Sequence, residues 1–490
     1  MINIQNFINK RKPNMYPMPN TGSVLDISAG SYCPGHKGQQ VLVGGLSLFS
    51  MIGALPNMGK TTVATGITGM VLVAYPKGVA HAHDTETTML EDRIEKLILD
   101  TMRLPIEGHK VPDSLITSNN LFFTNSVIYD GTDLFDLLKK FGKERLANEP
   151  QVDLEMIDDR TGKPFQWWYP IIEFWDSLSG MACRNAVEMQ DKAEVGTASM
   201  NMHAMRSNSG KSQIVEQLPN FTAKHAIYVL ATGQVGAQYQ LDPYRPNVRT
   251  LRFMNDNVKI KRVPEITSFV TGNCYIITKM SPMMTKGAPE FPYDRNDENE
   301  GTDLIELRFT NMRGKFGPSD IPHAIIFSQR DGWLPYMSNY IYLKDNDRYG
   351  FVGNNTTYHF ALYPEVKVQR TTLRQLFRSD WRLQRTVLFL VEMHWMNTRW
   401  DEEKLPVKYR CTPTELYDDI KALGYDWSIL LNTRFWHSTI KDGEEMIPYL
   451  STMDLLMMRT GDYHPYWYPV KKKDLVPTKA DEGKKEGDTK

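Results

Sequence analysis

The residues best suited to chemistry form a short loop that ends in Gly-Lys-Thr-Thr. Residues 54–62 read Ala-Leu-Pro-Asn-Met-Gly-Lys-Thr-Thr, after the apolar run 48–52 and before a helix-like pattern at 63–72. A loop of this length between a strand and a helix binds phosphate groups, because its backbone N–H groups and the helix N-terminus point at the anion. The pattern predicts a nucleoside triphosphate site whose binding residues are Ala54, Leu55, Pro56, Asn57, Met58, Gly59, Lys60, Thr61 and Thr62.

The last residues of this loop have separate chemical tasks. Gly59 lets the backbone approach the phosphates closely, Lys60 reaches the terminal phosphates, and the Thr61 hydroxyl completes the shell of a Mg²⁺ ion. The alternative is a chance Gly-Lys-Thr at a turn, and the strand-like run before the loop and the helical pattern after it argue against that alternative. Ala54 stands at the first position, where glycine is the stronger signal.

A magnesium site needs a carboxylate close to this loop. The run 171–177, Ile-Ile-Glu-Phe-Trp-Asp-Ser, predicts a buried strand that ends in Asp176. A carboxylate at the carboxyl end of such a strand lies beside a phosphate loop, where it holds Mg²⁺ through a bound water. Thr61 and Asp176 are therefore the predicted metal ligands.

Hydrolysis of a triphosphate also needs a group that orients the attacking water. Glu86 is the candidate, because it comes just after the strand that follows the first helix. The alternative is that Asp84 and Glu86 cap the next helix, as carboxylates often do. His81 and His83 alternate along the same strand without a third ligand, which favours structural histidines over a metal pair.

The elements around these residues follow an α/β pattern. From about residue 40 to 345, short apolar runs alternate with helix-like stretches, as in a largely parallel sheet flanked by helices. The predicted strands are 41–52, 71–82, 121–129, 169–177, 225–232, 273–279 and 323–328. Two long polar segments, at about 180–215 and 235–268, each follow a strand, and such loops are usually functional or mobile.

The composition divides the chain into four parts. Its 490 residues exceed one ordinary core and predict a large domain with a smaller one. Residues 1–30 are interpreted as an arm or linker and 31–345 as the core. Residues 346–470 are interpreted as a smaller, mainly helical domain, and 471–490 as a disordered charged tail.

The net charge, the cysteines and the apolar stretches of the chain indicate its compartment and its partners. The net charge is -1, so any contact with DNA requires a local basic patch. The 4 cysteines lie far apart, which predicts free thiols in a reducing compartment. No stretch approaches the roughly 20 apolar residues of a membrane span. We expect a cytoplasmic protein with no membrane contact.

The order and spacing of these motifs resemble the RecA-like core. The shared features are the Walker A loop at 54–62, an Asp-x-Glu at Asp84 to Glu86, and a later strand that ends in Asp176 and serine. The run 227–234 is similar to the family's strand that ends in a polar sensor. The resemblance implies that Gln234 lies opposite the γ-phosphate.

A fifth motif resembles the part of the family that acts between subunits. Residues 313–318, Arg-Gly-Lys-Phe-Gly-Pro, are similar to the Lys-x-Arg-x-Gly-Pro turn of hexameric RecA-like helicases and to the paired basic residues of RecA recombinases. The resemblance implies that Arg313 and Lys315 stabilise the transferring phosphoryl group of a neighbouring subunit. The alternative is an exposed basic hairpin turn. The predicted catalytic residues are thus Glu86, Lys60, Gln234, Arg313 and Lys315.

Residues 21–26 and 44–46 are similar to the segment that precedes the loop in phage recombinases of the UvsX type, and the resemblance covers about residues 20–345. It implies a RecA-like P-loop ATPase core with a mostly parallel sheet, with ATP and Mg²⁺ as cofactors. It implies a DNA-dependent ATPase that forms filaments on single-stranded DNA and exchanges strands with double-stranded DNA in phage recombination, repair and replication. The implied further partners are single-strand-binding and loader proteins, in the cytoplasm of an infected bacterial host.

Two other functions stay open from the sequence. One is a hexameric replicative or accessory DNA helicase, which uses the same core and the same basic residues in trans. Only about 30 residues precede the core, where such helicases carry a helical domain, and this favours the recombinase. The other is a binding module with a degenerate ATPase, against which the intact Lys60, Thr61, Asp176 and Glu86 argue.

In RecA-like recombinases, the loops after the Walker B strand and the sensor strand hold single-stranded DNA, and here these are the two long polar segments. Cations neutralise phosphates, and aromatic rings stack bases at about 1–3 kcal/mol each. The predicted DNA-binding residues are Arg184, Arg206, Lys211, Tyr239, Arg245, Arg249, Arg252, Phe253, Lys259, Lys261 and Arg262. The alternative is a pair of solvated surface loops, and the one-sided charge of the second segment favours DNA.

A row of arginines follows the core. Arg370, Arg374, Arg378, Arg382 and Arg385 recur at helical spacing, which predicts one basic helix face. Such a face could guide duplex DNA, or it could be the ordinary solvated side of an amphipathic helix. A helix break after the third arginine would interrupt the row.

Overall fold

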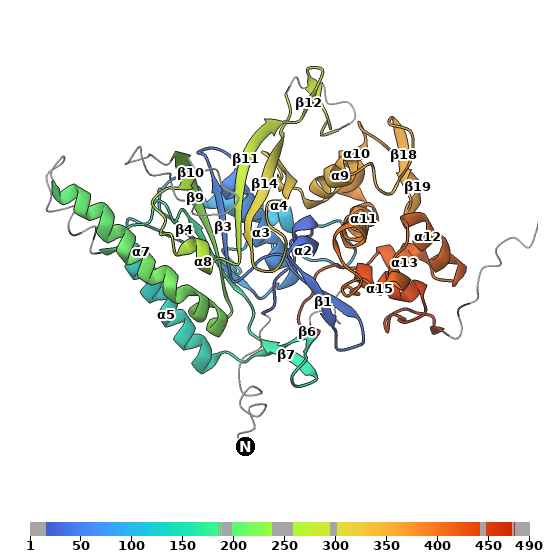
Figure 1. The fold of residues 1–490 in the computed structure, drawn as a ribbon, viewed down its shortest axis with the longest axis horizontal. Coiled ribbons are helices and arrows are strands. Elements are labelled where there is room, and N and C mark those ends of the chain that lie inside the picture. The colour runs from blue at the N-terminus through green and yellow to red at the C-terminus, as the bar shows by residue number, and fades with distance from the viewer. Residues whose placement is uncertain are drawn as a thin grey trace, which may run out of the picture.

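The computed structural model describes residues 16–184, 186, 188, 198–237, 258–294, 301–441, 447–472 and 475. A large mixed, mostly parallel sheet forms the centre, helices flank it, and a helical C-terminal region lies beside it (Figure 1). None of the helices in these ranges combines the length and the apolar character that crossing a bilayer requires.

Within the described residues the central sheet has ten strands. In spatial order they are β16 (Gly332–Trp333), β15 (Pro322–Ser328), β14 (Leu304–Gly314), β11 (Asn273–Pro282), β3 (Phe49–Ala54), β9 (Ile227–Ala237), β8 (Ile171–Asp176), β4 (Val79–Asp84) and β5 (Leu121–Asn125), with β10 (Val258–Ile260) paired to β9. Every neighbouring pair from β11 to β5 is parallel. The pairings of β14, β15, β16 and β10 are antiparallel. The predicted α/β class is confirmed.

Helices cover both faces of this sheet. They are α3 (Lys60–Ala74) and α4 (Glu91–Met102) on one face, and α5 (Gly131–Asn148) and α7 (Ala198–His225) on the other. Successive side chains of β3 pack against the helices on opposite faces of the sheet. Ile52 joins the apolar cluster of α3, while Met51 joins that of α5 and α7. Buried on both faces, the parallel strands read as continuous apolar runs.

The predicted strand at 71–82 is wrong in its first half. Helix α3 continues through Ala74, and β4 begins only at Val79. Every residue of α3 from Val63 onward is buried, so the helix has no polar stripe. An apolar run without periodicity does not distinguish a buried helix from a buried strand.

Two further elements differ from the sequence prediction. Strand β14 was not predicted, although it is one of the longest strands, because charged residues at 306 and 308 interrupt its apolar pattern. The segment predicted as a polar loop at 180–215 becomes helix α7 from Ala198 onward. Tertiary packing decides both cases, since β14 pairs with β11 and β15 inside the sheet and α7 packs against a face of it.

Residues 16–30, predicted as part of a linker, are packed into the molecule. Ser23 caps the short helix α2 (Val24–Ser28), and the carboxylate of Asp26 accepts hydrogen bonds from Thr21 and Gly22. Leu25 belongs to the core cluster of the sheet, and Val24 to that of the C-terminal region. This segment therefore joins the two parts of the chain.

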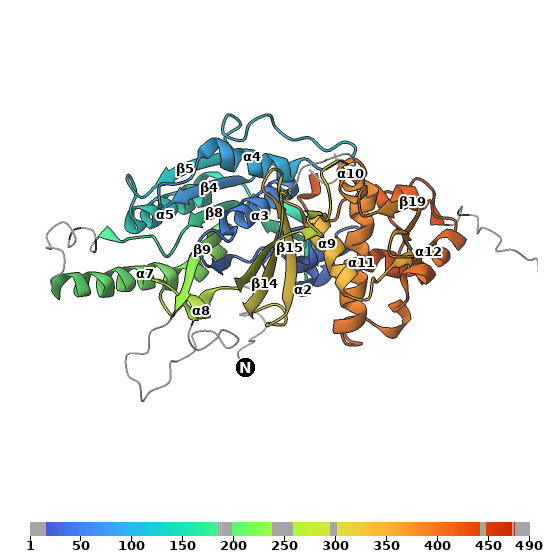
Figure 2. The same cartoon turned by 90° about the horizontal axis from the view of Figure 1, so that it is seen from above.

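The C-terminal region contains a small antiparallel sheet and several helices. They are β17 (Phe351–Gly353), β18 (Thr357–Phe360), β19 (Tyr363–Gln369), α10 (Leu373–Ser379), α11 (Trp381–Arg399), α12 (Pro413–Ala422), α13 (Trp427–Leu431) and α15 (Thr452–Arg459), reached through α9 (Pro335–Asp345). Figure 2 shows this region at one end of the sheet. Trp381 and Trp436 share an apolar cluster with α3, and a buried pair joins Arg434 Nη1 to Glu155 Oε2 at 2.9 Å.

The predicted arginine face does not form. The helix breaks at Asp380, which caps α11 by accepting from the Arg382 N–H. Arg374 is 1 % exposed and pairs with Asp303, while Arg385 is also 1 % exposed. These side chains lie in the interior, so a continuous basic surface for duplex DNA is absent from this part of the described structure.

Candidate functional site: the carboxyl edge of the sheet

The phosphate loop lies where strand β3 ends and helix α3 begins. Ala54 is the last residue of β3 and Lys60 the first of α3. Between them, Asn57 and Gly59 have φ angles of 59° and 71°, the left-handed region that favours glycine. A Cβ atom at Gly59 would lie 2.9 Å from Phe327 Cε1, so the loop is closed tightly against β15.

The loop follows β3 at the place where the strand order of the sheet reverses, which is where α/β sheets bind ligands. Strand β3 is flanked by β9 on one side and by β11 on the other, both parallel to it. The chain leaves β3 toward β4, on the β9 side, and returns later to β11 on the opposite side. In α/β sheets, ligands bind outside the carboxyl ends of the strands at such a switch in strand order.

Asp176 reaches the loop across one intervening strand. Thr61 Oγ1 donates to Asp176 Oδ2 at 2.5 Å, and Thr232 Oγ1 on β9 donates to the other carboxylate oxygen. The two predicted metal residues are thus in direct contact. Thr232, which is fully buried, orients the carboxylate and was missed by the sequence prediction.

Glu86 and Gln234 also meet at this edge. Gln234 Nε2 donates to Glu86 Oε1 at 3.3 Å, and the Ser177 hydroxyl lies 3.3 Å from the same oxygen. Glu86 is exposed to solvent. The carboxylate is therefore held by two side chains and still faces water.

Glu86 does not cap the helix that follows it. Helix α4 begins after Leu90, and no described side chain caps its N-terminus. Asp84 instead orders the turn, because its carboxylate accepts from the Glu86 N–H at 2.9 Å and from the Met89 N–H at 2.7 Å. The capping alternative is wrong for α4, and Asp84 acts as a support for the loop that carries Glu86.

Lys60 is available to a ligand. Its ammonium donates to the carbonyl of Leu55 in its own loop at 3.3 Å, in an exposed contact. A phosphate oxygen would be a better acceptor than this carbonyl, because it carries charge.

His81 and His83 belong to a buried hydrogen-bond network beneath the site. His81 Nδ1 lies 2.8 Å from Glu173 Oε2, and both rings contact the Thr124 hydroxyl. Burial opposes the charged form of His81, but the Glu173 carboxylate outweighs it and raises the pKa of His81 above its usual value. Burial lowers the pKa of His83 to about 4. Their side chains link β4, β5 and β8.

Arg313 and Lys315 lie at the opposite edge of the sheet from the phosphate loop. Gly314 pairs with Asn273, and Asn273 pairs with Ser50 near the start of β3. Arg313 Nη2 donates to the Phe269 carbonyl at 3.0 Å. Burial and the neighbouring Arg313 lower the pKa of Lys315. The fold does not bring these two residues to the chain's own loop.

The predicted DNA-binding residues have different outcomes. The prediction that Lys211 contacts DNA is corrected by its position. The side chain is 2 % exposed, and its ammonium donates to the carbonyls of Leu178, Ser179 and Arg262. Burial lowers the pKa of Lys211 to about 8. It ties together the segments after β8 and β10 and does not offer its charge to DNA.

The remaining members of that set lie on or outside the described surface. Arg184 is exposed and forms an ion pair with Asp133. Lys259, Lys261 and Arg262 are exposed in and just after β10. Arg206 lies within α7. The predicted residues Tyr239, Arg245, Arg249, Arg252 and Phe253 lie outside the described residues.

Comparisons with known proteins add no family to this picture. No protein-family model matches the chain, and no curated protein matches it in sequence. The site must therefore be interpreted from its own geometry.

Proposed function

We propose that the chain is an ATPase of the RecA-like kind that acts on DNA. The observation that carries the proposal is the convergence of four side chains at one sheet edge: Thr61 from the start of α3, Asp176 from β8, Glu86 from the turn after β4, and Gln234 from β9. Backbone amides, a lysine, a hydroxyl and two carboxylates at this edge are the groups that binding and hydrolysis of a triphosphate require.

The side chains have distinct roles in this proposal. Lys60 and the N-terminus of α3 bind the β- and γ-phosphates. Thr61 and Asp176 fit a magnesium site, because a hydroxyl and a carboxylate meet there and hard oxygen ligands suit this ion. When bound, Mg²⁺ neutralises charge on the phosphates. Glu86 accepts a hydrogen bond from the attacking water and orients it, and Gln234 holds that carboxylate in place.

Completion of the site by a second copy of the chain is part of the proposal. Arg313 and Lys315 lie level with Ser50, at the far end of β3 from Lys60. Their own phosphate loop is therefore out of reach, whereas a neighbour stacked head to tail presents its loop to them. A cation added in this way stabilises charge on the transferring phosphoryl group.

A recombinase filament on single-stranded DNA is the assembly we infer. The exposed Lys259, Lys261 and Arg262 follow the strand that carries Gln234, so a DNA contact there would be coupled to the nucleotide. ATP binding at each interface would hold the filament, and hydrolysis would release the strand. Pairing with a duplex would follow from the extended strand in the filament.

Two experiments test the proposal. Lys60→Ala should abolish DNA-stimulated ATP hydrolysis, while Lys367→Ala, an exposed lysine far from the site, should leave it unchanged; equal turnover in both variants would refute the site. Electron microscopy with a non-hydrolysable ATP analogue and single-stranded DNA should show helical filaments. Closed rings would assign the chain to the helicase alternative.

A further inference from the structure

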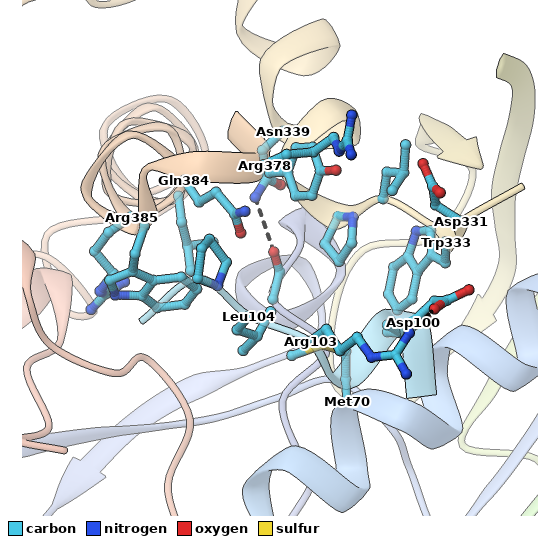
Figure 3. Close-up of a pocket in the computed structure, with 18 of the residues that line it drawn as sticks. Met70, Asp100, Arg103, Leu104, Asp331, Trp333, Asn339, Arg378, Gln384 and Arg385 are labelled. Carbon is cyan, nitrogen blue, oxygen red and sulfur yellow. Dashed lines mark hydrogen bonds and ion pairs between the residues drawn. The ribbon is translucent and has the colours of Figure 1, made fainter. Parts of the chain in front are cut away.

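A cavity of about 290 Å³ lies between the central sheet and the C-terminal region. Its walls come from α3, the end of α4, β16, α9 and α11 (Figure 3). Met70, on its floor, follows Lys60 by ten residues along α3, which corresponds to about 15 Å of helix. The cavity is thus separate from the phosphate loop.

Flat aromatic side chains form much of the wall. Trp333, Trp381 and Phe435 are 1 %, 4 % and 9 % exposed, and each of them lines the cavity. The rings of Trp381 and Phe435 are stacked with their centroids 6.2 Å apart. Such surfaces favour a planar ring as the occupant, because aromatic faces stack on one another.

Unpaired polar atoms line the same cavity. Trp333 Nε1 and Asn339 Oδ1 are buried and have no hydrogen-bond partner within the described part of the chain, which is costly unless a ligand or water supplies one. The amide nitrogen of Asn339 donates to the Gly22 carbonyl at 2.9 Å, the dashed line in Figure 3. Gln384 donates its Nε2 to the Phe377 carbonyl at 2.7 Å and keeps its amide oxygen as an acceptor.

The arrangement of these atoms defines a hydrogen-bond pattern. Figure 3 shows Gln384 on one side of the cavity, Trp333 on the other and Asn339 between them. The indole N–H and the Asn339 oxygen require an acceptor and a donor, and the Gln384 oxygen can accept from a further donor. A ring nitrogen beside an exocyclic amino group, as in adenine and cytosine, presents this combination.

A cation lies at the rim. The Arg378 guanidinium lies 3.9 Å from the centroid of the Tyr293 ring, and its Nη1 is 3.8 Å from Asp294 Oδ1. These two contacts hold the guanidinium at the mouth of the cavity. The acids at the rim are already paired, Asp331 with Arg374 and Asp100 with Lys96 and Arg103. Arg378 has one long ion pair, to the exposed Asp294, and is therefore the rim cation that can exchange its partner for a bound anion.

We propose that this cavity binds a nucleotide, with an amino-bearing base between the aromatic walls and its phosphate on Arg378. Its volume is close to the lower end of the roughly 300–1,000 Å³ of ligand sites, which suits a mononucleotide. The site is distinct from the phosphate loop and does not depend on ATP hydrolysis.

The test uses the full chain carrying Lys60→Ala, so that binding at the phosphate loop is suppressed. Calorimetric titration with AMP should give saturable binding, with UMP at least tenfold weaker because it lacks the amino group. Adding Arg378→Gln should weaken AMP about tenfold and leave uncharged adenosine unchanged. Arg399→Gln, which removes an exposed arginine at the far end of α11, is the matched control.

A second variant tests the cavity itself. Leu104→Trp should fill it and remove binding of both AMP and adenosine. Absence of saturable AMP binding, equal affinity for UMP, or equal effects of Arg378→Gln and Arg399→Gln would overturn the proposal. A 5′-phosphorylated oligonucleotide that displaces AMP would identify a DNA end as the source of the nucleotide, and AMP binding without displacement would identify a free nucleotide. Both results support a nucleotide site.

Discussion

Gln234 Nε2 donates to Glu86 Oε1 at 3.3 Å although the two residues lie 148 positions apart in the chain. Glu86 follows β4 and Gln234 lies in the last part of β9, and β8 with Asp176 runs between these strands. Because all three strands are parallel, their carboxyl ends meet at one edge of the sheet. The contact therefore joins Glu86, whose carboxylate is suited to orient water, to strand β9, which pairs with β10.

Glu86→Gln should retain nucleotide binding and lose hydrolysis. The amide keeps the shape of the side chain but accepts a proton poorly, and loss of such a group costs about 10²–10⁴-fold in rate. Steady-state ATPase assays and binding of a fluorescent ATP analogue measure the two properties. Glu144→Gln, on the exposed side of α5, should leave both unchanged; a similar loss of hydrolysis there would contradict the role of Glu86.

Thr232→Val should raise the Mg²⁺ concentration needed for half-maximal ATP hydrolysis by about 10-fold or more, the usual cost of losing a residue that orients a metal ligand. The valine keeps the volume of the side chain but removes the hydroxyl that donates to Asp176. A magnesium titration of the ATPase rate measures the effect. Thr232→Ser should restore the wild-type requirement, and a failure of serine to do so would indicate a packing role alone.

Mixing two inactive variants should restore ATP hydrolysis. Arg313→Ala has an intact phosphate loop, and Lys60→Ala has an intact Arg313, so an interface between the two variants contains one complete site. Each variant alone should show little turnover, and the mixture should show activity that depends on the ratio. No recovery across all ratios would contradict completion of the site in trans.

The stability of the wild-type chain should rise with pH between about 8 and 10.5 relative to that of Lys211→Met. Burial lowers the folded-state pKa of Lys211 from 10.5 to about 8. In this window the unfolded chain binds a proton that the folded chain has released, so the free energy of unfolding increases with pH. Denaturant unfolding at several pH values measures the difference, and parallel pH profiles would show that Lys211 does not titrate in this range.

Local sequence was enough to predict the parts of the site that are contiguous. The strand, loop and helix around Gly59 and Lys60 occur as predicted, because hydrogen bonds and glycine geometry within a few residues specify them. The acidic residues at strand ends were found for the same reason. Thr232 was missed, because a buried threonine in an apolar strand has no local signal, and only its contact with Asp176 gives it a role.

The spacing of basic residues was a poorer guide to their exposure than strand ends were to the positions of the acidic site residues. The sequence predicted Lys211 as a DNA-binding residue and Arg374 and Arg385 as part of a basic helix face, yet each is buried in the structure. Their partners are carbonyls or acids from distant segments, such as Asp303 for Arg374. Burial of a charge depends on what the fold brings to it, and spacing along a helix does not contain that information.

The sequence by itself determined the α/β class and the strand, loop and helix around Lys60, and it singled out Glu86 and Asp176, since these follow from periodicity and short motifs. Only the tertiary structure decided that Glu86 contacts Gln234, that Arg313 and Lys315 lie at the far edge, and that a cavity separates α3 from α11. The physical reason is that strand order and domain packing depend on long-range burial, which one chain segment does not specify.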